Sequence, residues 1–365
     1  MNIKSLLLGS AAALVAVSGA RAADAVMAPE PEPVEYVRVC DAYGAGFFYI
    51  PGTETCLQIS GYVRYEIRAS EVNGVGTAGT NPWFATEGWR KHVEARVNFD
   101  ARTETEWGTL RSYIRFQASD YQGSGSADLA VGLDQAYIQL AGFTMGYTES
   151  YFVDGFSPVG TYGSHSMNGG PGYSMSGGYG YAQRALIAYN FNSNGFFGAI
   201  SLEDDASDNY VPDVVLKAGY AAGWGGVYGV VGIDEDNNNA AVGGDTEFAL
   251  RGGVQINVPN SPGSNLRVFG FYASGTNAYW DQAEWSVAAS YQHQFSPMFF
   301  AHVGARYWSD IAFVNGRDGW GAEAGVGVNL SPNFQVRGEV IYTDWEGVNN
   351  NDGVVSGRMR FIRTF

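Results

Sequence analysis

Apolar and polar residues alternate strictly along stretches of nine to twelve residues. In segment 57–68, LQISGYVRYEIR, the odd positions are apolar or glycine, and the even positions carry Gln, Ser, Tyr, Arg and Glu. Segments 92–102, 250–258 and 322–330 repeat the pattern, each with one uncharged face. A period of two predicts β-strands, because successive side chains then point to opposite faces of a sheet. Such runs exceed the usual strand of about 5 or 6 residues and match the roughly 10 needed to cross a bilayer obliquely.

The connections between these stretches alternate in length. A soluble β-sandwich would also alternate in polarity, so connection length is the better guide to the fold class. Seven short turns are expected at 105–109, 141–142, 192–195, 221–226, 259–265, 296–298 and 331–333. Eight longer polar connections are expected at 69–90, 119–130, 148–183, 204–212, 234–246, 273–283, 308–319 and 345–353. Together they would join 16 strands, with the asymmetry that is typical of an outer-membrane barrel.

The predicted fold is therefore all-β, a transmembrane antiparallel β-barrel of 16 strands over residues 57–365. Closure removes every free strand edge, which lipid cannot hydrogen-bond. A barrel of about this size encloses an aqueous channel. The longest connection, the third at 148–183, is rich in Gly, Ser and Tyr. We expect it to fold into the lumen as a constriction loop; a mobile surface loop is the alternative.

The first 22 residues have the features of a secretory signal peptide. Lys4 precedes an apolar stretch from Leu6 to Val17, and small residues surround the expected cleavage site after Ala22. The apolar stretch is too short to span a bilayer of about 30 Å. Export through the secretory pathway is therefore expected.

Residues 23–56 are predicted to form a periplasmic N-terminal segment that begins with a Pro-rich acidic stretch. It contains both cysteines, Cys40 and Cys56. In an oxidising compartment two thiols this close in sequence are expected to form a disulfide, worth about 3 kcal/mol. Two free buried thiols are the alternative. Neither cysteine has partners at metal-ligand spacing, and we expect no metal and no cofactor.

Composition and charge exclude several classes of protein. Beyond the signal, no apolar run approaches the roughly 18 residues of a membrane helix. The formal charge is −16, and it becomes −18 without Lys4 and Arg21. An acidic chain repels nucleic acid, so nucleic-acid partners are not expected. Acidic outer connections would instead favour cations, and we expect modest cation selectivity.

Several charged residues are candidates for a pore constriction. Arg64, Arg96, Arg115 and Arg358 all fall near mid-height on the polar faces of the first three strands and the last strand. These strands become neighbours when the barrel closes, so the four guanidinium groups would form a basic wall. Glu149 and Asp154, at the start of the longest connection, are the candidate acidic partners. Opposed charges at a narrow place order water and exclude large apolar solutes.

The sequence resembles the alphaproteobacterial porin family from end to end. The resemblance is carried by APEPEP, by VEYVRVCDAYGAGFFYIPGTETC around the cysteines, by GYVRYEI, AYIQL, PDVV and AGWG, and by the aromatic-ended C-terminus. It implies a 16-stranded homotrimeric general porin of the outer membrane, with a constricting third loop, that passes ions and small hydrophilic solutes passively. It also implies that Phe365 is recognised by the barrel-assembly machinery. Outer-membrane lipid and lipopolysaccharide are further expected partners.

Three other functions were weighed against this one. An enzyme is disfavoured because the 4 histidines are scattered. His165 has no adjacent acidic orienting residue, His92 and His302 are expected in the barrel wall, and His293 is expected near a periplasmic turn. A sugar-selective channel would use loop aromatics as a stacking surface; the candidates are Tyr151, Phe152, Phe156 and Tyr162. A surface adhesin would use the acidic outer connections to bind partners.

Overall fold

The fold is that of a computed structural model, which describes residues 38–71, 88–122, 131–153, 163–167, 183–204, 211–235, 246–346 and 353–365. The signal peptide and the Pro-rich stretch lie outside these residues. Within the described part of the chain, no helix is long and apolar enough to cross a membrane.

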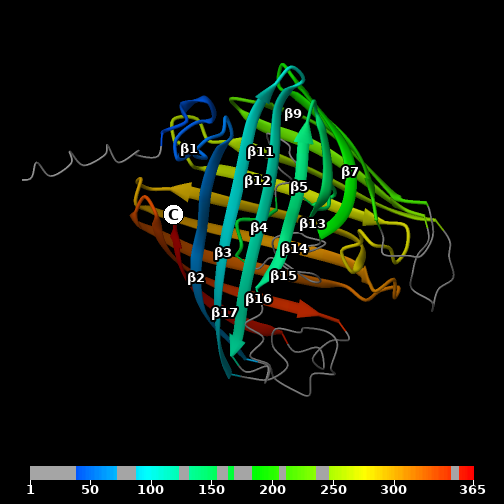
Figure 1. Cartoon of the computed structure of the whole chain (residues 1–365). Helices are drawn as coiled ribbons and strands as arrows, with labels where there is room; N and C mark the ends of the chain where they lie inside the picture. The colour runs from blue at the N-terminus through cyan, green and yellow to red at the C-terminus, as the bar shows by residue number, and fades with distance from the viewer. Residues whose placement is uncertain are drawn as a thin grey trace, which may run out of the picture.

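Sixteen long antiparallel strands of the described residues close into one barrel, as predicted (Figure 1). Their bounds are β2 (Cys56–Glu71), β3 (Gly88–Thr105), β4 (Gly108–Gln122), β5 (Gly132–Leu140), β6 (Phe143–Glu149), β7 (Gln183–Ser193), β8 (Phe196–Glu203), β9 (Asp213–Ala222), β10 (Gly225–Asp234), β11 (Glu247–Asn257), β12 (Asn265–Ala273), β13 (Ala283–Gln294), β14 (Phe299–Ile311), β15 (Gly319–Ser331), β16 (Phe334–Trp345) and β17 (Val354–Thr364). Each strand pairs with the next in sequence. The predicted turns and longer connections fall between these strands in the predicted order.

The barrel closes where β17 pairs with β2. Phe361 lies opposite Tyr65, and the register continues to Thr364 opposite Tyr62. Phe365 extends the seam, since its N–H and C=O both pair with Gly61 at 3.0 Å. An added Cβ on Gly61 would lie 3.0 Å from the Phe365 ring. It would also overlap the Arg96 carbonyl oxygen, so glycine at this position lets both β3 and the terminal ring approach the seam.

The tight turns explain why the short connections stay short. Ala141 and Gly142 have φ of 51° and 87°, and Asn194 and Gly195 have φ of 50° and 84°. Two successive positive φ values are typical of the two-residue hairpin turn whose twist matches that of the flanking strands. Asn and Gly tolerate this backbone conformation best, and here they occupy three of the four positions.

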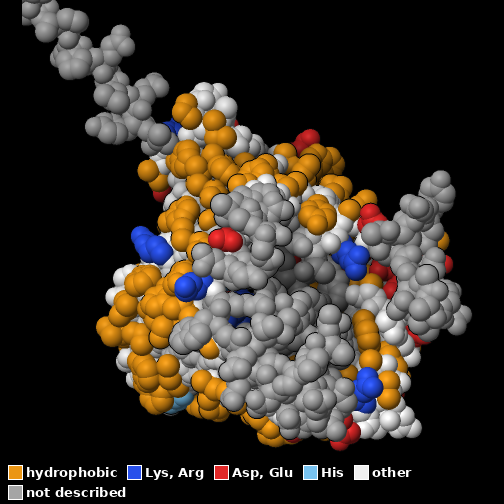
Figure 2. Space-filling model, turned by 90° about the horizontal axis from the view of Figure 1, so that it is seen from below, with side chains coloured by type: hydrophobic (Ala, Val, Ile, Leu, Met, Phe, Trp, Pro, Cys, Tyr) orange, Lys and Arg blue, Asp and Glu red, His pale blue; other side chains and the backbone are white. Residues whose placement is uncertain are grey.

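Burial follows the predicted alternation. On β2, Ile59 and Val63 are 45% and 50% exposed, whereas Glu66 is fully buried. On β15, Val326 is 47% exposed and Glu323 only 4%. Hydrophobic side chains accordingly gather around the edge of the molecule in the view of Figure 2. The outer face is the apolar one, as a bilayer requires.

The N-terminal segment contains regular structure that the sequence analysis did not anticipate. A short 3-10 helix, η2 (Asp41–Tyr43), leads into the three-residue strand β1 (Phe47–Tyr49), which pairs with the first residues of β2. The predicted disulfide between Cys40 and Cys56 is present, with 6.0 Å between the Cα atoms. Strand β1 thus covers the edge of β2 just beyond the point where β17 ends (Figure 1).

The inner face is not polar all round. Apolar side chains from β7 to β13 pack with residues that follow β6 and β12 into one buried cluster, which includes Tyr151, Phe152, Phe269 and Tyr279. Gly232 on β10 makes room for it, because an added Cβ would lie 2.6 Å from the Tyr279 ring. Many inward-facing positions on this side are therefore occupied by packed apolar side chains, with buried charged residues such as Lys217 and Arg251 among them.

Candidate functional site

The four predicted arginines lie on the four adjacent strands β17, β2, β3 and β4. We call Arg358, Arg64, Arg96 and Arg115 the arginine wall. The last three keep 17–18% of the side chain exposed. Arg358 is level with Arg68 in the register, not with Arg64, so the wall runs obliquely across the strands.

Carboxylates that the sequence analysis did not single out are interleaved with the arginine wall. Arg64 is 2.7 Å from Glu94 on the next strand. Arg115 is 3.5 Å from Asp134, and Arg96 is 3.9 Å from the same carboxylate. Three arginines of the wall thus form ion pairs, and each keeps part of its side chain exposed to solvent.

A β-bulge turns Asp134 into the lumen. On β5, Gln135 lies opposite Arg115 and Leu133 opposite Phe116, so Asp134 is the extra residue. Asp134 and Gln135 both bond to lumen-facing groups, although neighbours on a regular strand would face opposite sides. No alternation pattern predicts this residue, because the bulge breaks the period of two.

The two predicted acidic partners have different outcomes. Glu149, the last residue of β6, lies 3.3 Å from the Arg115 guanidinium and accepts a hydrogen bond of 3.0 Å from Gln135. Asp154 lies outside the described residues.

Charged and aromatic side chains continue the wall toward the short-turn end of the barrel. Asp100 accepts hydrogen bonds from Arg102 at 2.9 Å and from Arg111 at 2.7 Å. The Arg111 guanidinium also lies over the rings of Tyr113 and Tyr137, which stack with centroids 5.0 Å apart. This arrangement fixes the guanidinium groups in place while it leaves part of each exposed.

A short part of the longest connection is bonded to side chains of the barrel wall, including Arg358 of the arginine wall. We call Gly163–Met167 the tethered segment. Its His165 ring contacts the Ser290 hydroxyl at 2.6 Å and the Asn265 amide oxygen at 2.9 Å. Its carbonyl oxygens accept hydrogen bonds from Arg337, Arg358 and Arg360. The Gly163 carbonyl oxygen also lies 3.5 Å from the Arg267 guanidinium.

Carboxylates hold the other side of the tethered segment. Glu339 on β16 accepts the Met167 N–H at 2.7 Å and the Ser166 hydroxyl at 3.0 Å. Glu323 on β15 accepts the Ser164 hydroxyl at 3.2 Å. The tethered segment is thus bonded to side chains of β12, β13, β15, β16 and β17.

Of the four residues expected for a sugar-stacking surface, the two that the structure describes are buried and not available for stacking. Tyr151 and Phe152 are 1% and 0% exposed and belong to the apolar cluster. Phe156 and Tyr162 lie outside the described residues.

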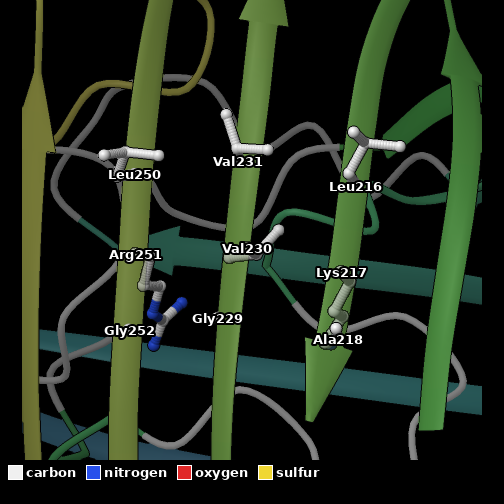
Figure 3. Close-up of a pocket in the computed structure, with 9 residues that line it drawn as sticks. All are labelled: Leu216, Lys217, Ala218, Gly229, Val230, Val231, Leu250, Arg251 and Gly252. Atoms are coloured by element: carbon white, nitrogen blue, oxygen red, sulfur yellow. The ribbon is translucent and has the colours of Figure 1, made fainter.

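Figure 3 shows a shallow groove over β9, β10 and β11, with a volume of about 500 Å³. Leu216 and Leu250 border it and are 41% and 42% exposed, whereas the Arg251 side chain, which points away from them, is buried. The groove therefore lies on the apolar outer face and is not a site for polar solutes. Among the described residues, no group of three or more His, Cys, Asp or Glu could hold a metal ion.

Comparison with known proteins decides the family. A profile of the porin subfamily matches residues 24–359. Porin Omp2a of Brucella melitensis biotype 1 is 36% identical over the full length of both chains. This chain belongs to the porin subfamily. The expected resemblance to alphaproteobacterial porins is confirmed.

Solved structures share the fold of this porin at low identity. The outer-membrane channel DcaP of Acinetobacter baumannii has a TM-score of 0.67 at 12% identity, over 87% of this chain and 99% of that one. OmpT of Vibrio cholerae, in its trimer form, has a TM-score of 0.60 at 11% identity, over 86% and 100% of the chains. These likenesses support the barrel fold alone.

The family and the fold together give the function. This porin is an outer-membrane diffusion channel that is filled with water and passes ions and small hydrophilic solutes passively. Its relatives are channels rather than enzymes. The sugar-selective alternative is not favoured.

Proposed function

We propose that this porin is a general pore whose narrowest part lies between the arginine wall and the connection 148–183. The tethered segment carries the proposal, because it is the part of that connection that bonds to inward-facing side chains on five strands. Arg64, Arg96, Arg115 and Arg358 are the basic side of the constriction. Glu149 is an acidic partner, and Asp154 has that role on sequence grounds only.

The guanidinium and carboxylate groups would act on solutes because they lie apart across a narrow passage. The arginine wall is partly exposed, and the apolar cluster fills the side of the lumen from β7 to β13. Solutes therefore pass along fixed guanidinium and carboxylate groups, which order water and disfavour large apolar molecules.

Export and assembly follow from the rest of the chain. In this proposal residues 1–22 are removed as a signal peptide, and residues 23–56 lie on the periplasmic side with the disulfide. The packing of Phe365 against the seam is compatible with recognition by the barrel-assembly machinery. The trimer form of OmpT, which shares the fold, supports a homotrimer. Outer-membrane lipid and lipopolysaccharide would contact the apolar outer face and the rim.

Planar bilayers test the proposal directly. The purified protein should insert in steps of three equal conductances, and these should show little saturable block by sugars. In liposome-swelling assays, uptake should fall steeply with the size of the hydrophilic solute. A bilayer that stays silent, or a conductance that a single sugar saturates, would contradict the proposal.

A further inference from the structure

Glu66 on β2 is the shared partner of three arginines. Its Oε2 accepts a hydrogen bond of 2.8 Å from Arg68, and its Oε1 lies 3.4 Å from Arg64 Nε and accepts a hydrogen bond from Arg360. His92 on β3 lies 3.7 Å away. Three neighbouring strands thus place their basic side chains around one carboxylate.

Glu66 lies behind the cations that it binds. Its side chain is 0% exposed, whereas those of Arg64 and Arg360 are 18% and 16% exposed. A solute in the lumen therefore meets guanidinium groups first, with their counter-charge beneath them. A carboxylate buried this deeply is stable only with cations and hydrogen bonds around it, and the three arginines supply them.

Few carboxylates balance the guanidinium groups in this part of the wall. Arg64, Arg68 and Arg360 share two acidic partners on β2 and β3, Glu66 and Glu94. Glu94 also accepts the hydroxyl groups of Tyr62 and Ser119. Glu66 is therefore the carboxylate that the most guanidinium groups share.

We propose that Glu66 sets the ion preference of the lumen by compensating this layer of arginines. The inference rests on the proposed function, because it requires ions to pass along the arginine wall. Without the Glu66 charge the layer gains one uncompensated positive charge. A unit charge about 5 Å from the ion path changes the local concentration of each ion about two- to fourfold in a water-like dielectric. The effects on anions and cations are opposite, so the permeability ratio should change about four- to sixteenfold toward anions.

Reversal potentials in a KCl gradient test this inference. Glu66→Gln keeps the shape of the side chain and should shift the preference toward anions by that factor. Glu104→Gln is the matched control: it removes the same charge from the same chain, but Glu104 is exposed at the short-turn end of β3. It should leave the reversal potential unchanged.

Arg360→Gln keeps the test decisive if Glu66→Gln does not fold. This variant removes a positive charge from the same cluster and should shift the preference toward cations. The double variant should return close to the wild type, which a merely structural role of Glu66 would not produce. Conducting variants with an unchanged reversal potential would overturn the inference and leave the proposed pore intact. Absence of conductance in the wild type would instead overturn the proposed function.

Discussion

Glu339→Gln is the sharpest test of how the tethered segment is held. Glu339 is 4% exposed and accepts hydrogen bonds from the Met167 N–H at 2.7 Å and the Ser166 hydroxyl at 3.0 Å. The Oε2 atom that accepts the Met167 N–H also lies 3.2 Å from His302 Nε2. Glutamine has the same shape, but its amide nitrogen would face donors and its oxygen carries no full charge.

The size of the expected effect follows from the two hydrogen bonds that Glu339 accepts from the tethered segment. A hydrogen bond to a charged group contributes about 1.5–3 kcal/mol. If the amide oxygen retains one of the two, the segment loses about one such bond. The population in which the segment is released should then rise about ten- to a hundredfold. The contacts to Glu323, Ser290 and Asn265 remain, so the main conductance level should persist.

Single-channel recording measures this effect. Glu339→Gln should show brief transitions to a higher conductance, more frequent than in the wild type by about the factor above. Glu346→Gln is the matched control, because Glu346 follows the same strand and is exposed. If the variant and its control have the dwell times of the wild type, the tethered segment does not narrow the pore in the way proposed.

Three further outcomes are expected. Replacing Cys40 and Cys56 by alanine should destabilise the N-terminal segment by about 3 kcal/mol and speed hydrogen exchange there, with unchanged conductance. Phe365→Ala should lower the amount of assembled barrel in outer-membrane fractions but not the conductance of the pores that form. The Tyr307 hydroxyl donates to Asp318 at 2.6 Å and lowers the pKa of that carboxyl. The Asp318 carboxylate should therefore stabilise the folded protein above its unfolded-state pKa of about 4. This stabilisation should be lost as the pH falls through the lower pKa of the folded state, so the unfolding midpoints of wild type and Asp318→Asn should converge in acid.

Much of the barrel could be predicted because its two strongest signals are local. Alternation over nine to twelve residues determines which face meets lipid, and loop chemistry determines where the strands end. Glu66 and Glu94 were placed on the polar faces in the same way. Their partners were not identified, because partners on other strands depend on register, which the sequence of one strand does not contain.

Other features were missed for identifiable physical reasons. Asp134 faces the lumen only because of a β-bulge, which breaks the period of two. Strand β10 reads GGVYGVVGID, with apolar residues on both faces, so its contribution to an apolar cluster inside the lumen had no distinguishing pattern. Strand β1 has three residues, too few for any periodicity. The sequence therefore predicted the strands of the barrel well but not the packing of the interior.

The contacts of the tethered segment separate pore width from ion preference. Arg337 and Arg358 donate to its backbone carbonyl oxygens, which carry no net charge, so their own positive charge is not neutralised by the segment. We therefore propose that strand carboxylates such as Glu66 set the charge of the passage, whereas the tethers set its width. Replacing Ser164 and Ser166 together by alanine removes two hydroxyl donors without changing any charge. This variant should alter the conductance transitions and leave the reversal potential unchanged; a shift in ion preference would show that the two properties are coupled.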